Sequence, residues 1–410
     1  MAAERIEEAV AAMGAGALSA TTLSRHVRPL FSRVLREQAG KIYLANHSLG
    51  RPLDATADDV AEALALWPTR MGRAWDDWSL ELRAFRERLA RLLGAPRPDC
   101  IVPKTSAGQG LRAILNTYDH AAQVVATRGE FDSIDVILRH YAQRGRISLR
   151  FVEPGEGGTF AAADVRAAVR AGTDLVVLSQ VMFNSGQVLP ELGALVDDAH
   201  GAGARVLLDV YHSLGALPVD VAALDVDFAV GGSYKYLRGG PGSCFLYLHP
   251  RHLDGNVSTL DVGWFAKRDA FDYRRPDPPR WAEGGDAFME STPPVLTWYQ
   301  ARAGQRLALA LGAARVRQYT LAQQRGLVDW LAREGIAAAG GDEARGAFCV
   351  VDLAHRGEDA ALRCARALDD EGVIVDARGR WLRLCPDILS TDDELARAAA
   401  ALAQILAAPG

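Results

Sequence analysis

From about residue 99 onward, short apolar runs typical of β-strands alternate with longer amphipathic stretches typical of helices. The runs Val-Val-Leu at 176–178 and Val-Leu-Leu at 206–208 fit strands that are covered on both faces. Strands that alternate with helices form βαβ units on a largely parallel sheet, so the sequence predicts an α/β fold. We expect strands at 100–103, 123–127, 148–152, 174–179, 205–210 and 243–248, and helices at 106–118, 134–144, 162–171 and 190–202.

The C-terminal part of the chain has a different pattern, which indicates a smaller α+β unit. Thr391 and Glu394 have the spacing of a capping box, which predicts a helix at 395–407. A helical stretch at 297–334 connects this unit to the large one, and the N-terminal segment is expected to pack on the small unit. Further expected elements of the small unit are strands at 347–353, 373–375 and 381–384 and a helix at 359–371. The expected division is an N-terminal segment 1–45, a large domain 46–305 and a small domain 306–410.

Composition argues against several classes of protein. The 410-residue chain has a net charge of −5 and therefore lacks the positive charge typical of nucleic-acid-binding proteins. It has no run of 18 apolar residues, so no membrane-spanning helix is expected. No basic region precedes an apolar core at the N-terminus, which predicts a cytoplasmic location. The five cysteines are scattered, without a C-x-x-C pair or clustered histidines, so neither a disulfide framework nor a metal site is indicated.

The most informative segment spans 206–242 and reads VLLDVYHSLGALPVDVAALDVDFAVGGSYKYLRGGPG. Asp209 ends an apolar strand, and His212 follows three residues later. A second β-like stretch leads to Tyr234 and Lys235, and a glycine-rich turn comes next. Arginine supplies nearly all of the positive charge, and the lysines of the chain are Lys41, Lys104, Lys235 and Lys267.

These residue types are the ones that pyridoxal phosphate chemistry requires. A lysine amine condenses with the cofactor aldehyde and later moves the proton at the substrate α-carbon. A carboxylate such as Asp209 keeps the pyridine nitrogen protonated, and its place at a strand end fits a ligand site. Tyr234 and the amides of the glycine-rich turn can reach the phosphate. Taken singly, Asp209 could be a turn cap, His212 a core histidine and Lys235 a surface charge, but their combined spacing favours the cofactor site.

The Asp-x-x-His pair followed by Ser-Tyr-Lys-Tyr-Leu resembles the class V aminotransferase family, and within it the kynureninases. The resemblance covers most of the chain. It implies the aspartate aminotransferase fold (type I), with pyridoxal phosphate bound to Lys235. Tyr234 is discriminating, because cysteine desulfurases of the same fold have histidine at that position. The stretch Asn46-His47-Ser48-Leu49-Gly50 resembles the Asn-Ser-Leu-Gly stretch of kynureninases, with His47 as an extra residue.

The resemblance also assigns contacts to the cofactor beyond Lys235, Asp209, His212 and Tyr234. Thr105 and Ser106 stand where a strand ends and a helix opens, and they would hold the phosphate. A simple helix N-cap is the other reading of these two residues, and both can hold together. Phe131 matches the aromatic residue that stacks on the cofactor ring, and Asn184 matches a residue that touches it.

Three further matches concern the partner subunit and the substrate. The stretches Val262-Gly263-Trp264-Phe265 and Ser291-Thr292-Pro293-Pro294 resemble segments that, in the family, reach across a dimer interface to the partner's phosphate. The resemblance therefore implies a homodimer with composite sites, in which Trp264 and Thr292 contact the cofactor, although Trp264 could also be a core residue. Arg383 corresponds to the arginine that binds the substrate carboxylate in a bidentate manner; a surface ion pair is the alternative.

The implied activity is a kynureninase-like hydrolysis of an amino acid, which breaks a Cβ–Cγ bond and releases alanine and a carboxylic acid. His47, Trp75 and Trp264 would contact an aromatic substrate tail. The chain departs from kynureninases at 385–389, where they have a Pro-Leu-Tyr stretch, and at 70–78. Another class V reaction therefore stays open as the alternative: a β-lyase, a decarboxylase or an aminotransferase. A binding protein that merely retains the fold is a third hypothesis, against which the intact site residues argue.

Overall fold

The computed structural model describes residues 2–407, and its central element is a mixed, mostly parallel sheet. Within these residues the sheet has seven strands in the order β2-β8-β7-β6-β5-β3-β4. Neighbouring strands from β4 to β7 pair in parallel, whereas β8 runs antiparallel to both β7 and β2. The predicted α/β fold is confirmed. The strands are β2 (Ile101–Lys104), β3 (Ala122–Thr127), β4 (Ile147–Val152), β5 (Leu175–Ser179), β6 (Arg205–Asp209), β7 (Phe228–Gly232) and β8 (Cys244–Leu248).

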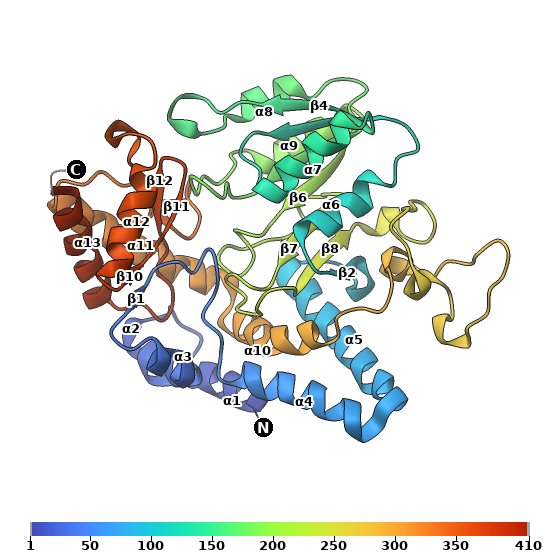
Figure 1. The fold of residues 1–410 in the computed structure, drawn as a ribbon, viewed down its shortest axis with the longest axis horizontal. Helices are drawn as coiled ribbons and strands as arrows, with labels where there is room; N and C mark the ends of the chain where they lie inside the picture. The colour runs from blue at the N-terminus through green and yellow to red at the C-terminus, as the bar shows by residue number, and fades with distance from the viewer. Residues whose placement is uncertain (1, 408–410) are drawn as a thin grey trace.

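Helices cover this sheet, as the green and cyan elements of Figure 1 show. Every residue of β5, β7 and β8 is buried, as expected for strands that are covered on both faces. Ser106 caps the N-terminus of one helix with its side chain, and Gly94 ends another in the left-handed conformation that suits glycine. The helices are α5 (Ala74–Leu93), α6 (Ala107–Leu115), α7 (Asp132–Gln143), α8 (Ala162–Ala168) and α9 (Leu192–Gly201).

The C-terminal elements, red in Figure 1, form a separate layer beside the large sheet. In the described part of the chain they contain a three-stranded antiparallel sheet in the order β11-β12-β9. The capping box is present, because Thr391 and Glu394 exchange hydrogen bonds of 2.8 and 3.2 Å. The elements are β9 (Cys349–Asp352), α12 (Ala360–Asp370), β10 (Val373–Ile374), β11 (Asp376–Arg378), β12 (Trp381–Leu384) and α13 (Asp392–Ala407).

Two long helices connect the large sheet to the C-terminal elements. They are α10 (Leu296–Leu311) and α11 (Ala313–Arg333), and they occupy the stretch predicted to be helical. The break between them falls at Gly312, whose φ of +80° is readily adopted only by glycine. Between β8 and α10 the chain forms a long excursion with short 3₁₀ turns at Trp264–Ala266, Ala270–Asp272 and Gly284–Phe288.

The N-terminal elements pack below both parts, as the blue segments of Figure 1 show. Ile6, Val10 and Phe31 share a buried cluster with Leu307 of α10 and with Leu389 of the small unit. β1 pairs in parallel with β10, so the predicted strand at 373–375 lies outside the three-stranded sheet. The N-terminal elements are α1 (Ala2–Ala11), α2 (Ala20–Thr22), α3 (Ser32–Glu37), β1 (Ile42–Tyr43) and α4 (Ala55–Arg70).

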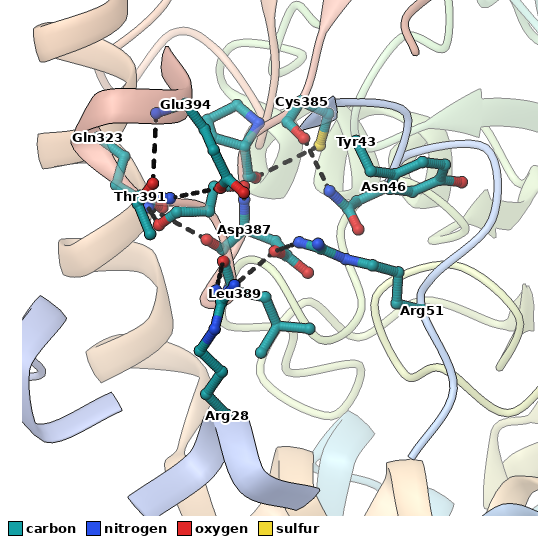
Figure 2. Close-up of polar contacts among 12 residues, drawn as sticks. Arg28, Tyr43, Asn46, Arg51, Gln323, Cys385, Asp387, Leu389, Thr391 and Glu394 are labelled. Atoms are coloured by element: carbon teal, nitrogen blue, oxygen red, sulfur yellow. Dashed lines mark hydrogen bonds and ion pairs between the residues drawn. The ribbon is translucent and has the colours of Figure 1, made fainter. Parts of the chain in front are cut away.

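The division into 1–45, 46–305 and 306–410 remains our proposal. One buried hydrophobic cluster follows the large sheet, and a second follows the C-terminal elements together with Ile42 and Leu44. The boundary at 305 falls inside α10, so this helix is shared by the two proposed domains. A buried ion pair of 2.5 Å between Arg51 and Asp387 connects the segment between β1 and α4 to the loop after β12 (Figure 2).

Candidate active site

The parallel strands β5, β6 and β7 end side by side at one edge of the sheet. Ser179 ends β5 and pairs in register with Asp209, which ends β6. β7 ends three residues before Lys235. This edge is the general position of ligand sites in open α/β sheets. A cavity of about 420 Å³, called the site cavity below, lies here. Its lining includes Ser48, Thr105, Ser106, Phe131, Ser179, Phe183, Asp209, Tyr211, His212, Tyr234 and Lys235.

Lys235 and His212 form a close pair in the site cavity. Lys235 is 5% exposed, and its Nζ lies 2.5 Å from Nε2 of His212. Burial lowers the pKa of the Lys235 amine below its usual 10.5, although attraction to Asp209 opposes the shift. Burial, together with the charges of Lys235 and Arg383, lowers the pKa of His212 well below its usual value. A neutral imidazole nitrogen can accept a hydrogen bond from the amine, and the neutral amine is the nucleophilic form.

Asp209 presents a buried carboxylate to the same cavity. Its Oδ1 accepts a hydrogen bond of 2.8 Å from the Tyr211 amide. Burial raises the pKa of Asp209 above its usual 3.8, while the Tyr211 amide and the charge of Lys235 oppose the shift. A buried carboxylate is costly unless a cation or a donor pairs with it. A ligand with a protonated ring nitrogen would supply that partner.

Another part of the lining is built by the junction of β2 and α6. Ser106 is the N-cap of α6, and its Oγ accepts a hydrogen bond of 3.1 Å from the Gln109 amide. The Thr105 amide donates to Oε1 of Gln109 at 2.8 Å. Free amides and the positive end of the helix dipole make a helix N-terminus attractive to phosphate groups. Both predicted phosphate-binding residues therefore lie where an anion can bind.

Two aromatic rings flank the site cavity. Phe131 precedes α7 with an extended backbone, and its ring centroid lies 5.7 Å from Nζ of Lys235. The ring of Phe183 meets that of Phe131 edge-on, with centroids 5.4 Å apart and planes at 90°. This geometry leaves an aromatic surface on which a flat heterocycle can stack. Asn184 follows Phe183 and accepts a hydrogen bond of 2.7 Å from the Ser185 amide, but it does not line the site cavity in the described structure.

Arg383 and His47 lie behind the lining. Arg383 is 2% exposed on β12, and its Nη1 donates to the carbonyl of Phe183. The ring centroid of His47 lies 6.4 Å from that of His212. Burial and the charge of Arg383 lower the pKa of His47 to about 3, so His47 is neutral at physiological pH. Both residues can affect a ligand in the site cavity, but from its edge.

Trp75, Trp264 and Thr292 are elsewhere: within residues 2–407 they do not line the site cavity. Nε1 of Trp264 donates to Oγ1 of Thr292 at 3.3 Å, so these two lie together. Trp75 of α5 packs against Phe265, with ring centroids 5.6 Å apart. Thr292 lines a neighbouring cavity of about 300 Å³ that also includes Thr105. Any contact of Trp75 or Trp264 with the site cavity would have to come from a second copy of the chain or from a rearrangement.

Several residues that line the site cavity or contact it were not indicated by the sequence patterns. Tyr211 lies between the predicted Asp209 and His212, and Phe183 precedes the predicted Asn184, so proximity in sequence was the available signal. Asp376 contacts Arg383 although seven positions separate them. No local pattern placed these two residues together, because their contact depends on the pairing of β11 with β12.

The described residues contain no group of three or more His, Cys, Asp or Glu side chains arranged to bind a metal ion. Between residues 2 and 407, none of the helices combines the length and apolarity needed to cross a membrane.

The residues of the site cavity fit pyridoxal phosphate in their chemistry. A buried amine faces a buried carboxylate, and among the described residues Nδ1 of the neighbouring His212 has no hydrogen-bond partner. Hydroxyls and helix amides for a phosphate stand at Thr105 and Ser106, and Phe131 offers a stacking surface. The aldehyde, the pyridine nitrogen, the phosphate and the ring face of the cofactor therefore each have a complementary group in this chain.

Comparison with known proteins identifies the family. The sequence model of the family described as aminotransferase class-V matches residues 68–383. Kynureninase from Bacillus cereus is 26% identical over 398 residues, which covers 92% of this chain and 91% of that protein. Kynureninase from Geobacillus thermodenitrificans is 29% identical over 380 residues, covering 86% and 85%.

Solved structures show the same fold. The cystine C-S lyase C-DES, in complex with cysteine persulfide, has a TM-score of 0.79 at 22% identity over 90% of this chain and 99% of that chain. The cysteine desulfurase CsdA from Escherichia coli has a TM-score of 0.78 at 16% identity, over 95% and 99%. Another C-DES structure contains glycine linked covalently to its pyridoxal phosphate. The fold is that of a pyridoxal-phosphate-dependent enzyme, and the residues that line the site cavity fit this cofactor in their chemistry. The chain belongs to the class V aminotransferase family.

Proposed function

We propose that this enzyme is a kynureninase-like hydrolase that cleaves the Cβ–Cγ bond of an amino acid with a γ-carbonyl group. The observation that carries the proposal is the similarity to kynureninases along most of the chain, from the N-terminal part to the small unit. The cysteine desulfurases and the C-S lyase share the fold at 22% identity or less, which supports no particular reaction. Tyr234, which lines the site cavity, stands where the desulfurases have histidine.

The proposed cofactor contacts follow from the lining. Lys235 carries pyridoxal phosphate, with His212 holding the amine, and Asp209 pairs with the pyridine nitrogen. Thr105, Ser106 and the N-terminus of α6 bind the phosphate. Phe131 stacks on the ring, and Tyr234 contributes its hydroxyl at the phosphate end. Asn184, which follows Phe183, and His47 are proposed to act at the edge of the site cavity.

When bound, pyridoxal phosphate supplies an electron sink for charge that develops at the substrate α-carbon. The charged Asp209 stabilises the protonated ring nitrogen on which that capacity depends. Lys235 removes the α-proton, because its lowered pKa makes the neutral amine available near neutral pH. In the net reaction, water adds its hydroxyl to the γ-carbonyl carbon, the Cβ–Cγ bond breaks, and Cβ gains a proton. The products are alanine and a carboxylic acid.

Arg383 is proposed to bind the substrate carboxylate, and Trp75 and Trp264 to contact an aromatic tail. Since Trp264 and Thr292 do not line the site cavity of their own chain within the described residues, we propose that the partner subunit of a homodimer supplies them. A composite site of this kind also explains why the excursion between β8 and α10 extends away from the large sheet (Figure 1).

The test is to add L-kynurenine and 3-hydroxykynurenine to the purified holoenzyme and to measure alanine and the anthranilate product. We expect both products, together with a visible absorption band that borohydride bleaches. Lys235→Ala should lose the band and the activity. Lys41→Ala is the matched control, because Lys41 is exposed immediately before β1 and does not line the site cavity. A cofactor band without alanine release would contradict the proposed reaction and leave the family assignment intact.

A further inference from the structure

We propose that Asp376 is a resident counter-anion that holds Arg383 away from the site cavity, so that a substrate carboxylate must displace it to bind. Asp376 lies on β11 and Arg383 on β12, and they are directly opposite each other in the antiparallel pair. Nη2 of Arg383 lies 2.5 Å from Oδ2 of Asp376. The inference rests on the proposed role of Arg383 as the carboxylate-binding residue.

The contacts of Asp376 connect it to the site cavity. Oγ of Ser48, which lines the cavity, donates to the same Oδ2 that accepts from Arg383. Nη1 of Arg383 donates to the carbonyl of Phe183, whose side chain also lines the cavity. In the described chain, the buried Nε of Arg383 has no hydrogen-bond partner. Arg383 therefore contacts residues that line the cavity without lining it, and its Nε can still donate to an incoming anion.

The charges of this cluster leave room for one carboxylate. Oδ1 of Asp376 lies 2.9 Å from Nη1 of Arg378, whose side chain is 44% exposed. Two guanidinium groups and one carboxylate give a net charge of +1. His47, at 3.6 Å from Oδ2 of Asp376, adds no charge because it is neutral. A single monoanionic carboxylate would neutralise the cluster.

The consequence for binding depends on burial. The Arg383 side chain is 2% exposed, and a buried guanidinium without a counter-ion is strongly unfavourable. Asp376 supplies that counter-ion while no substrate is bound, and it competes with the substrate carboxylate afterwards. Removing its charge should therefore tighten the binding of carboxylates, the opposite of what loss of a substrate-binding residue would do. Arg378 draws Asp376 towards solvent, so removing Arg378 should weaken carboxylate binding.

The test uses propionate, a monocarboxylate without an amino group, titrated calorimetrically into the holoenzyme at low salt. For Asp376→Asn we expect the dissociation constant of propionate to fall by about tenfold. For Arg378→Gln we expect it to rise by about threefold, a smaller change because Arg378 is solvent-screened. Asp352→Asn is the matched control: Asp352 pairs with Arg380 at the surface of the same small sheet, and propionate binding should not change.

Unchanged or weaker propionate binding in Asp376→Asn would overturn the proposal. If Asp376→Asn does not fold, Arg378→Gln decides alone, and unchanged or tighter binding in that variant would overturn it. The proposed reaction is tested separately by alanine release from the wild-type enzyme. Tighter propionate binding without alanine release would support the counter-anion and contradict the kynureninase-like reaction. Alanine release by the wild-type enzyme, with unchanged propionate binding in Asp376→Asn, would support the kynureninase-like reaction and contradict the counter-anion.

Discussion

At the scale of single residues, Glu130 is a buried acid that no step of the proposed reaction uses. Its Oε1 accepts from Oγ1 of Thr127 at 2.7 Å and from the Ser179 amide at 3.1 Å, and its Oε2 lies 2.6 Å from Oγ of Ser179. Burial raises the pKa of Glu130 from 4.5 to about 8, against these hydrogen bonds and helped by the charge of Asp209. Glu130 therefore fixes the strand end next to Asp209 while it stays protonated at neutral pH.

This protonation predicts a specific pH dependence. Because the folded-state pKa of Glu130 is raised, the folded state binds more protons between pH 4.5 and 8 than the unfolded state, and stability falls as pH rises through this range. The titration of Glu130 lowers the free energy of unfolding by up to about 1.4 kcal/mol per pH unit. Glu130→Gln, which resembles the neutral acid, should lose less stability than the wild type between pH 6 and 8. Urea unfolding at several pH values measures this, and parallel curves for the two proteins would contradict it.

Single residues differed in how far the sequence predicted them. Sequence patterns identified Lys235, Asp209 and His212 because these residues follow two predicted strand ends at fixed spacings. The structure places all three in one cavity. Glu130 and Asp376 were not identified from the sequence, because their importance depends on burial and on cross-strand contacts that no local pattern contains. The roles of the predicted site residues remain predictions, and their positions are what the structure adds.

At the scale of elements, the loop after β12 is tied to two other segments by one carboxylate. Asp387 is 4% exposed and pairs with Arg51 at 2.5 Å (Figure 2). It also pairs with Arg238, three residues after Lys235, at 2.9 Å. Its Oδ1 also accepts from the Leu389 amide at 2.9 Å. Burial would raise the pKa of Asp387, but the two arginines hold it at about 2. Asp387 therefore connects the small unit to the segment between β1 and α4 and to the loop that contains Lys235.

Removing this carboxylate should destabilise the protein strongly. Asp387→Ala leaves two buried guanidinium groups without their shared counter-ion, and we expect a loss of about 3–5 kcal/mol in the free energy of unfolding. Asp393→Ala is the control, since Asp393 is 81% exposed and its partner Arg397 is at the surface. The free energy of unfolding of Asp393→Ala should fall by less than about 1 kcal/mol. Equal urea midpoints for the two variants would show that Asp387 does not join these segments.

Elements were predicted well where hydrophobic periodicity is strong and less well where tertiary contacts define them. The strand at 381–384 and the helices at 359–371 and 395–407 appear within a few residues of their expected bounds. β11 had no prediction, because Asp-Ala-Arg has no β-like pattern and the strand exists through its pairing with β12. The predicted strand at 373–375 pairs with β1, a long-range contact that local sequence does not contain.

At the scale of the whole molecule, exposed apolar side chains gather on the excursion between β8 and α10. Leu260 is 73% exposed, Tyr273 71% and Trp281 43%. Tyr273 stacks on Trp264 with ring planes at 14°, which connects this surface to a predicted cofactor contact. Aromatic side chains are enriched in protein interfaces. The predicted homodimer would bury it, whereas the sequence alone indicated the dimer only through resemblance.

Subunit mixing tests whether the partner completes the site. Lys235→Ala removes the amine from one chain, and Trp264→Ala with Thr292→Ala removes the contacts proposed to act on the other. If the sites are composite, random mixing of the two inactive variants gives heterodimers with one intact site each, and about a quarter of wild-type activity should return. Mixing Lys235→Ala with Asp209→Ala, which affect the same chain's part of the site, gives heterodimers in which each site lacks one of these residues. No activity should return in that control. If sedimentation verifies heterodimers but the mixture of Lys235→Ala with the Trp264→Ala and Thr292→Ala variant also regains no activity, each chain builds its site alone.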